Sequence, residues 1–433
     1  MCCKFFTKRT QTSTSGTILA ALASLALLLA PAPAPAQAPA SAQETSPSAP
    51  PPPSPALAAQ PRFCKALPGF QFEFPRDHFS HPCFRTEWWY FTGNLSDPNG
   101  RRFGFELTFF REGVDNPYPN PSRWRVDDLY LAHFAVSDIA AERFSYTDRL
   151  HRAGIGMAGA DPAKGRIWNG DWSATLDGRA WRLEAASEGA SEAGQRIRLE
   201  LNPLRPPVIQ GRDGVSQKAS GEGNASHYYS LTRLATSGVI ETAGTSFEVS
   251  GLSWMDHEFS TNQLQPDQVG WDWVSLQLDD GTDWMFFQLR RRAGEGDTSG
   301  AAGGNTNGGA SGTASGTKDP HSAGSLALPD GTSVQLSAAD FEMTPLDEWR
   351  SPHSGGHYPI RWRIQVPSQG LDVTLAAAME DQELITQETT GVTYWEGSVL
   401  SRGTRNGKPV QGRGYLEMTG YAGPLQPGLY SAE

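Results

Sequence analysis

The alternation of apolar and polar residues predicts β-strands along almost the whole chain from residue 70 onward. Short alternating runs such as EWWYFTGNLSD, RRFGFELTFFR and LYLAHFAVSD are separated by Gly, Asn, Asp and Pro. Strands of this length, separated by turn residues at this spacing, are typical of a sandwich or a barrel. The sequence therefore predicts an all-β protein.

The clearest strand pair is the stretch 270–290, GWDWVSLQLDDGTDWMFFQLR, which predicts a β-hairpin around an Asp-Gly turn. Strict alternation places Trp271 and Trp273 on one face of the first arm and Asp272 on the other face, among apolar side chains. An isolated carboxylate in such surroundings is unfavourable unless it is paired, protonated or next to a cavity. Asp272 is therefore the sharpest candidate for a functional residue.

This hairpin recurs within the chain. Residues 87–111 match residues 270–290, with Trp88 aligned to Trp271. Three further pairs of blocks follow in the same order, 133–148 with 324–340, 171–187 with 361–379 and 246–258 with 407–420. They align Trp172 with Trp362, Trp254 with Tyr415 and Asp256 with Glu417. We interpret the repeats as two copies of a meandering antiparallel β unit, each closed or nearly closed so that few strand edges stay exposed.

The expected domains are residues 66–262 and 263–433, and each contains an insertion outside the matched blocks. The first insertion, at about 187–226, carries a loop rich in Pro and Gly. The second, at about 293–324, is a low-complexity run of Gly, Ser and Thr that we expect to be disordered.

The N-terminal 38 residues have the features of a secretory signal peptide. Basic residues precede an apolar run at 18–30, and Ala-Gln-Ala at 36–38 fits a cleavage site. A Pro/Ala-rich linker at 39–65 follows. We therefore expect a secreted or periplasmic protein whose mature chain has no integral membrane segment, because no later apolar stretch is long enough to span a bilayer. An uncleaved signal that stays as an anchor is the alternative.

Charge and cysteines narrow the possible partners and the redox compartment. The formal net charge is −11, and removing residues 1–38 takes away three basic and no acidic residues, which gives −14. An acidic protein of this kind is a poor candidate for binding nucleic acid. Cys64 and Cys83 are the two cysteines that remain after cleavage, and we expect them to form a disulfide. Two unpaired buried thiols are the alternative.

Several motifs in this order resemble the AttH/CrtC-like family, which includes carotenoid 1,2-hydratases and secreted proteins usually called hydrolases. The motifs are EWWYFTG, SWMDHEFS, GWDWVSLQLDDG, YPIRW, YWEG and GYLEMTGY, and the resemblance spans roughly residues 68–423. It implies two tandem lipocalin-like antiparallel β-barrel domains, in agreement with the internal duplication. It does not settle the function, because members of the family differ in chemistry.

A hydratase needs an acid that protonates an unactivated alkene and surroundings that stabilise the resulting carbocation. A carboxyl group whose pKa is raised by an apolar site can be the acid, and indole faces can stabilise the cation. The candidate catalytic residues are Asp272, Asp256 and His257. The candidate substrate-binding residues are Trp254, Trp271, Trp273, Glu87, Trp88 and Tyr90. Asp256 and Asp272 flank the segment that joins the two repeats, so we expect them to approach one another across an aromatic-lined cleft.

Plain structural roles explain the same residues almost as well. Tryptophans on strands are mostly core residues. The run 256–258 fits a strand cap that bridges the two barrels, and Glu87 with Arg111 fits a buried ion pair across the first hairpin. His78 and His81 have an HxxH spacing, but their segment lacks helical periodicity, so we expect no metal site and no cofactor.

Together these features favour a secreted hydratase or hydrolase acting on a small hydrophobic substrate, such as a polyene, a terpenoid or a lipid-like molecule. A non-catalytic periplasmic carrier of an apolar ligand is the alternative, because a barrel of about eight strands can enclose a small ligand. The absence of a G-x-S-x-G motif argues against a serine hydrolase.

Overall fold

The structure is a computed structural model, and it describes residues 63–115, 120–187, 194–262, 264–292 and 316–423. All of them lie in the second of the two units into which the chain divides, Gln60–Glu433. The expected signal peptide, the expected linker up to residue 62 and residues 293–315 of the second insertion lie outside the described residues. Among the residues that are described, no helix is long and apolar enough to cross a membrane.

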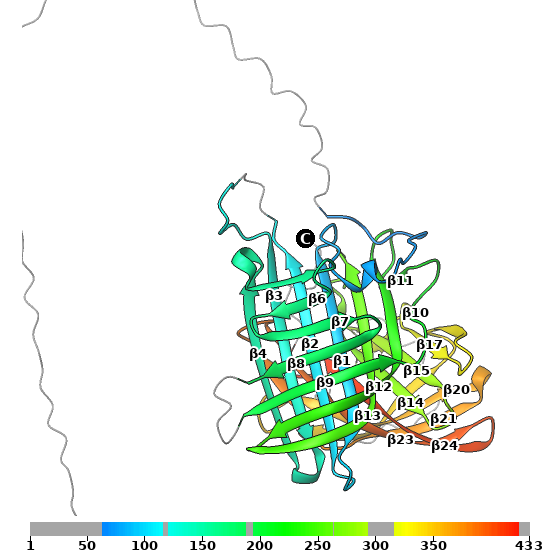
Figure 1. The fold of residues 1–433 in the computed structure, drawn as a ribbon. Coiled ribbons are helices and arrows are strands. Elements are labelled where there is room, and N and C mark those ends of the chain that lie inside the picture. The colour runs from blue at the N-terminus through cyan, green and yellow to red at the C-terminus, as the bar shows by residue number, and fades with distance from the viewer. Residues whose placement is uncertain (1–62, 116–119, 188–193, 263, 293–315, 424–433) are drawn as a thin grey trace, which may run out of the picture. The chain divides into compact units, whose positions relative to one another are not determined.

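The first repeat forms one antiparallel sheet (Figure 1). Its strands are β1 (Thr86–Ser96), β2 (Arg102–Gly113), β3 (Asp128–Asp138), β4 (Arg143–Arg152), β5 (Ala158–Asp161), β6 (Arg166–Asn169), β7 (Trp172–Asp177), β8 (Ala180–Ala186), β9 (Gln195–Pro203), β10 (Val208–Ile209), β11 (Ser216–Gln217), β12 (Ala225–Thr242) and β13 (Thr245–Ser260). The main path through the sheet is β4-β3-β2-β1-β13-β12-β9-β8-β7-β6-β5.

The second repeat forms a separate antiparallel sheet. Its strands are β14 (Gln268–Leu278), β15 (Asp283–Arg291), β16 (Thr317–Lys318), β17 (Ala323–Ala327), β18 (Ser333–Ser337), β19 (Glu342–Arg350), β20 (His357–Val366), β21 (Leu371–Ala377), β22 (Glu383–Thr386), β23 (Val392–Arg405) and β24 (Lys408–Thr419). Their main path is β18-β17-β15-β14-β24-β23-β21-β20-β19. The helical elements described are four short 3-10 turns, η1 (Arg76–His78), η2 (Ile139–Ala141), η3 (Gly154–Gly156) and η4 (Pro367–Gln369).

The first sheet curls until its two ends approach each other. In Figure 1 the strands β6 to β9 cross over β1 to β4, as opposite walls of a barrel do. Side chains link the two ends, because the Asn169 amide donates to the Tyr130 carbonyl at 3.0 Å and its oxygen contacts His151 Nδ1 at 2.5 Å. The predicted class, two tandem antiparallel barrel-like domains related by duplication, is confirmed.

The two sheets place equivalent strands at equivalent positions. Leu95 pairs with Gly251 between β1 and β13, and Leu278 pairs with Gly412 between β14 and β24. In the same registers Tyr90 lies opposite Asp256, and Trp273 lies opposite Glu417. The predicted equivalences of Trp88 with Trp271 and of Asp256 with Glu417 therefore agree with the strand pairing.

The predicted match of Trp172 with Trp362 is wrong. Trp172 lies on β7, whereas Trp362 on β20 pairs with Leu375 just as Trp181 on β8 pairs with Leu201. Trp181 is therefore the equivalent of Trp362. Successive hairpins of each repeat carry a tryptophan and a short turn, so a local match can slip by one strand.

The insertions are smaller than expected. Residues 195–203, inside the expected insertion at 187–226 but mostly before its Pro/Gly-rich loop, form β9, a full member of the first sheet. In the second insertion, residues 317–318 and 323–324 belong to β16 and β17, which pair with β15. Because β9 alternates apolar and charged residues, its own pattern already indicated a strand.

Three apolar clusters organise the packing. One fills the first barrel and includes Trp89, Phe91 and Leu95, and a second fills the other barrel. The third draws Tyr90 and Trp254 from the first sheet together with side chains of the second sheet. Both faces of β1 and β14 are thus buried, one inside the strand's own barrel and the other where the two sheets meet.

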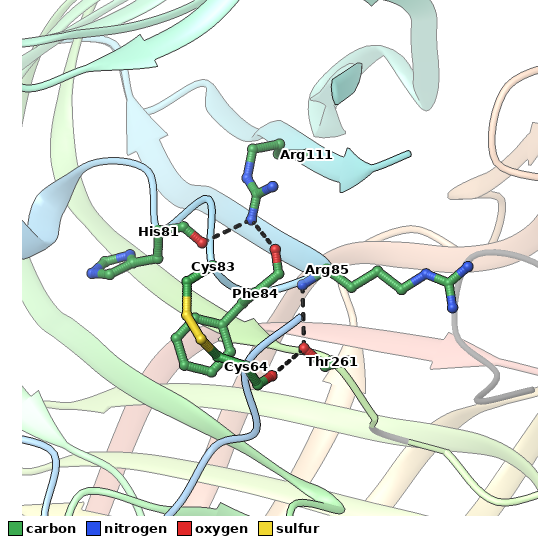
Figure 2. The surroundings of a disulfide bond; sticks show 7 residues. All are labelled: Cys64, His81, Cys83, Phe84, Arg85, Arg111 and Thr261. Carbon is green, nitrogen blue, oxygen red and sulfur yellow. Dashed lines mark hydrogen bonds between the residues drawn. A yellow bond between two sulfur atoms is a disulfide. The ribbon is translucent and has the colours of Figure 1, made fainter. Parts of the chain in front are cut away.

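A disulfide holds the N-terminal segment onto the first barrel. Cys64 and Cys83 are bonded, with Cα atoms 5.3 Å apart. Figure 2 shows the Thr261 hydroxyl donating to the Cys64 carbonyl and the Arg85 amide donating to that hydroxyl. The segment is therefore tied both by the disulfide and through Thr261, the residue that follows the last strand of the first sheet.

Replacing both cysteines by alanine is expected to lower the free energy of unfolding by about 3 kcal/mol, because the bond closes a loop of 19 residues. Denaturant titration of the double variant and the parent protein measures the difference. Mass spectrometry without reductant is expected to find one intramolecular link, and two titratable thiols in the folded protein would contradict it.

Candidate active site between the two barrels

A cleft lies where the two sheets face each other. Its walls come from β1, β2, β3, β12 and β13 of the first sheet and from β14, β15, β23 and β24 of the second. Lys218, Leu264 and Thr390 from connecting segments complete the lining. The enclosed space is about 950 Å³ when the part open to solvent is included. Small-molecule sites favour such domain boundaries.

Aromatic side chains are the most numerous class in the walls. The rings that line the cleft belong to Trp88, Tyr90, Phe110, Tyr228, Trp271, Trp273, Phe287 and Tyr394. The face opposite the barrel core of each strand supplies them, since neighbouring residues on a strand point to opposite sides. The cleft is therefore suited to an apolar ligand.

Five carboxyl groups also line this apolar space, Glu106, Asp256, Glu258, Glu396 and Glu417. Burial raises the pKa of Glu106 to about 8 and the pKa values of Asp256 and Glu417 to about 7. Burial, together with the charges of Glu106 and Glu417, raises the pKa of Glu396 well above its ordinary value. The cleft thus holds protonated acids near neutral pH.

Asp256 is the most strongly hydrogen-bonded of these groups. Its Oδ1 accepts from Ser230 Oγ at 2.5 Å and from Trp254 Nε1 at 2.7 Å, and its Oδ2 accepts from the Tyr228 hydroxyl at 2.6 Å. Three donors favour the ionised form and oppose the effect of burial. Asp256 is therefore suited to carry a negative charge in the cleft.

Glu106 has the opposite character. Its Oε1 accepts from Thr108 Oγ1 at 2.6 Å, whereas its buried Oε2 has no hydrogen-bond partner among the described residues. Glu396, on the other wall, accepts from the Tyr90 hydroxyl. A buried carboxyl group with one unpartnered oxygen is a candidate proton donor.

Among the described residues that line the cleft, Lys218 is the one Lys or Arg side chain. Its Nζ lies 2.9 Å from Glu258 Oε1 and 3.9 Å from the ring centre of Phe287. Its charge is therefore balanced within the wall. On the other side His133 Nδ1 contacts the Tyr394 hydroxyl at 2.6 Å, and burial lowers the pKa of His133 to about 4.

The structure places Asp272 outside the cleft. Its carboxylate is buried on the opposite face of β14 from Trp271 and Trp273, as the alternation predicts. There Arg290 Nε lies 3.3 Å from Oδ2, and the Tyr421 hydroxyl donates to Oδ1 at 2.9 Å. Burial raises the pKa of Asp272, and the Arg290 charge limits that rise. Asp256 and Asp272 therefore do not face one another across the cleft.

His257 and Glu87 also lie apart from the cleft. Glu87 pairs with Arg111 across the first hairpin, with Nε 2.9 Å from Oε2 and both side chains fully buried. His257 alternates with its neighbour Asp256 on β13 and contacts Glu87 Oε1 at 2.9 Å. Of the other candidates, Trp88, Tyr90, Trp271 and Trp273 line the cleft. Trp254 does not line it but donates a hydrogen bond from Nε1 to Asp256.

Sequence reasoning missed Glu106, Glu396 and Glu417 as site residues. Each is a lone carboxylate in an apolar or aromatic strand, in FGFELTFF, TYWEG and YLEM respectively. The same signal singled out Asp272. The missing information was which strand faces meet between the barrels, since that decides which lone carboxylates share a space.

Comparisons with known proteins agree with this architecture. A family model described as AttH-like matches residues 65–315 and 310–421. The crystal structure of a candidate AttH protein from Nitrosomonas europaea is 32% identical and superposes with a TM-score of 0.68, covering 83% of this chain and 100% of that one. No curated protein matches the chain.

Kievitone hydratase from Nectria haematococca shares the fold at 15% identity and a TM-score of 0.56, covering 84% of this chain and 98% of that one. This likeness shows the fold alone. The family match extends over both repeats and covers well over half of the sequence. The chain therefore belongs to the AttH-like family.

Proposed function

We propose that the cleft is a catalytic site that adds water to an apolar small molecule by acid–base chemistry. The observation that carries the proposal is Glu106, a buried carboxyl group with an unpartnered oxygen in an aromatic cleft. Its pKa of about 8 keeps it protonated at neutral pH. An acid of this kind can protonate a substrate that water alone does not.

In the proposed reaction the Glu106 proton forms a new C–H bond at one carbon of a substrate double bond. The π electrons make that bond, and the other carbon becomes a carbocation. A water molecule then donates an electron pair to the cation, and the oxygen loses a proton to the Glu106 carboxylate. One water is added and the acid is restored.

The surroundings suit the positive charge that develops in this step. Trp88, Trp271 and Trp273 offer indole faces, whose quadrupoles attract a cation. Asp256, with its three donors, supplies a negative charge in the same space whenever it is ionised. Groups set in place before the reaction lower the barrier without having to reorganise.

The proposed substrate class is a polyene, a terpenoid or a similar lipid-like alkene, because eight aromatic rings line the cleft. The name of one fold neighbour, kievitone hydratase, is in keeping with water addition. We further propose that the protein acts after export, as residues 1–38 predict. Hydrolysis by the same acid would require no nucleophilic serine.

The test incubates the protein with a panel of terpenoid, polyene and fatty-acyl alkenes in H₂¹⁸O and follows hydrated products by mass spectrometry. Glu106→Gln is expected to lose about 10²–10⁴-fold in turnover while it still binds the substrate, because the amide keeps the shape of the carboxyl group but cannot act as the acid. Glu112→Gln is the matched control, since Glu112 lies on the same strand, is partly buried beside Arg85 and does not line the cleft.

A carrier would give a different result. It would bind members of the panel without incorporating ¹⁸O, and Glu106→Gln would leave the affinity unchanged, whereas Trp271→Ala and Trp273→Ala would weaken it. Binding by both Glu106 forms with no product from the parent protein would thus overturn the catalytic proposal.

A further inference from the structure

A second cluster of polar side chains lies apart from the cleft, where the N-terminal segment meets β1 and β13. His81, Glu87 and His257 bring three ligand atoms, Nδ1, Oε1 and Nε2, within 4.8 Å of one another. Nδ1 of His81 is 2.7 Å from Glu87 Oε1, and Nε2 of His257 is 2.9 Å from the same oxygen. Glu87 and His257 are fully buried, and His81 is 13% exposed.

The remaining nitrogen of each ring faces Asp77. His81 Nε2 lies 3.2 Å from the Asp77 carboxylate, and His257 Nδ1 lies 3.0 Å from the Asp77 carbonyl. Both oxygens are acceptors, so each ring places its N–H there. Histidines that bind metals show this arrangement, with the second nitrogen donating to a carboxylate or a backbone carbonyl.

With those N–H groups engaged, both rings direct a lone pair at Glu87 Oε1, which is itself an acceptor. In these tautomers three acceptor atoms converge on one buried point, and a cation between them, either a metal ion or a proton on a ring, would relieve their mutual repulsion. The arrangement of donors and acceptors therefore favours a cation at the centre of the cluster.

The rest of Glu87 is already satisfied without Oε1. Its Oε2 accepts from Arg111 Nε at 2.9 Å, from the His81 amide at 2.9 Å and from Ser80 Oγ at 3.2 Å, and the same amide lies 3.1 Å from Oε1. Arg111 is held in turn by Asp128 at 2.9 Å and by the carbonyls of His81 and Phe84 (Figure 2). The Arg111 charge is thus directed at atoms other than Oε1.

We propose that His81 Nδ1, Glu87 Oε1 and His257 Nε2 bind one divalent metal ion of the zinc type. Two imidazoles and a carboxylate are a common zinc ligand set. At metal–ligand distances of about 2.0–2.1 Å, tetrahedral geometry separates ligand atoms by roughly 3.3 Å. Both nitrogens must therefore move away from Oε1, by about 0.6 Å from 2.7 Å for His81 and by about 0.4 Å from 2.9 Å for His257. The place of His81 outside the regular strands permits the larger movement.

Such an ion would fasten the N-terminal segment to the barrel. His81 comes from that segment, two residues before Cys83, whereas Glu87 and His257 come from β1 and β13. His81 is the ligand with exposed area, so its side is where water would complete the coordination. The HxxH spacing is not the reason for the site, because His78 Nδ1 instead contacts the Tyr229 hydroxyl at 2.6 Å.

The test measures metal directly. Purified protein is stripped with EDTA, dialysed, and titrated with zinc chloride by calorimetry, and its metal content is measured by inductively coupled plasma mass spectrometry. One equivalent of zinc and a rise in melting temperature are expected. Cobalt(II) is expected to give the visible absorption of a tetrahedral site, a signal that needs no knowledge of the substrate.

Variants separate this site from adventitious binding. His81→Gln and Glu87→Gln are expected to weaken zinc binding by at least about 100-fold, and Asp77→Asn by about 10–100-fold through misplaced rings. His78→Gln, the matched control in the same turn, is expected to bind zinc like the parent protein.

Less than one tenth of an equivalent of zinc on folded parent protein would overturn the proposal. So would unchanged affinity in a folded His81→Gln variant, which should fold because its side chain is at the surface of the cluster. Imidazole ¹⁵N spectra showing both rings doubly protonated in the presence of zinc would identify protons as the bridging cations. None of these outcomes depends on the proposed hydratase activity.

Discussion

Replacing Asp272 by Asn is expected to lower the free energy of unfolding by about 3–5 kcal/mol, because Arg290 would remain buried without a counter-ion. Arg290 is 3% exposed, and its guanidinium lies 3.9 Å from the ring centre of Tyr421. The Tyr421 hydroxyl can still donate to an asparagine oxygen, so the substitution removes the charge and little else. Guanidinium chloride titration measures the loss.

A double-mutant cycle supplies the control for this prediction. Asp272→Asn combined with Arg290→Met is expected to be less destabilised than Asp272→Asn alone, because the unpaired charge is gone. Ligand binding in the cleft should survive in both, since Asp272 faces the interior of the second barrel. An Asp272→Asn variant that unfolds like the parent but has lost turnover would make Asp272 catalytic, as the sequence-based hypothesis holds.

Raising the pH from 6.5 to 8 is expected to lower the free energy of unfolding by on the order of 2–3 kcal/mol. Burial raises the folded-state pKa of Glu106 to about 8 and those of Asp256 and Glu417 to about 7. Between the unfolded and folded pKa values only the native state holds the proton, so stability falls as the pH rises.

The window is chosen to isolate the carboxyl groups. Below pH 6.5 buried histidines act in the opposite direction, because burial lowers the pKa of His133 to about 4 and the unfolded chain takes up the proton first. In the unfolded chain a histidine is half protonated at its ordinary pKa of 6.5 and about nine-tenths neutral by pH 7.5, so the carboxyl groups dominate the upper part of the window. Denaturant titrations at three pH values between 6.5 and 8 therefore measure the carboxyl contribution.

Glu106→Gln gives the matched comparison, because glutamine resembles the protonated acid and cannot ionise. The variant is expected to lose less stability over this window and to be more stable than the parent protein at pH 8. In the parent, turnover should fall above about pH 8 as Glu106 loses its proton. Equal pH slopes in the two proteins would show that Glu106 does not titrate here.

Local pattern was enough to predict the strands and the duplication. The opposite faces of Trp271 and Asp272 followed from alternation alone, and the equivalence of the two hairpins followed from their matching sequences. The same rule, applied to β13, places Asp256 and His257 on opposite faces of the strand, so the two side chains do not form one polar group. Neighbours on a strand cannot line the same wall.

Contacts between residues far apart in the chain could not be predicted from the sequence. The meeting of His257 with Glu87 spans 170 residues, and that of Tyr90 with Glu396 spans 306. Which lone carboxylates share the cleft depends on how one barrel packs on the other. A strand buried on both faces reads as nearly uniform hydrophobicity, so alternation does not reveal its outward face.

The divergence of the duplicated halves has a consequence for how the cleft can hold a guest molecule. Identical halves would offer an asymmetric guest two equivalent orientations and would treat both of its ends alike. Here the position of Glu106 on β2 corresponds to Met285 on β15, since each lies opposite the matching residue of its neighbour strand. Ser230, opposite Asp256, likewise corresponds to Glu396, opposite Glu417. The divergence of the two copies thus makes the two ends of the cleft chemically different, so we expect an asymmetric guest to be held in one of the two orientations.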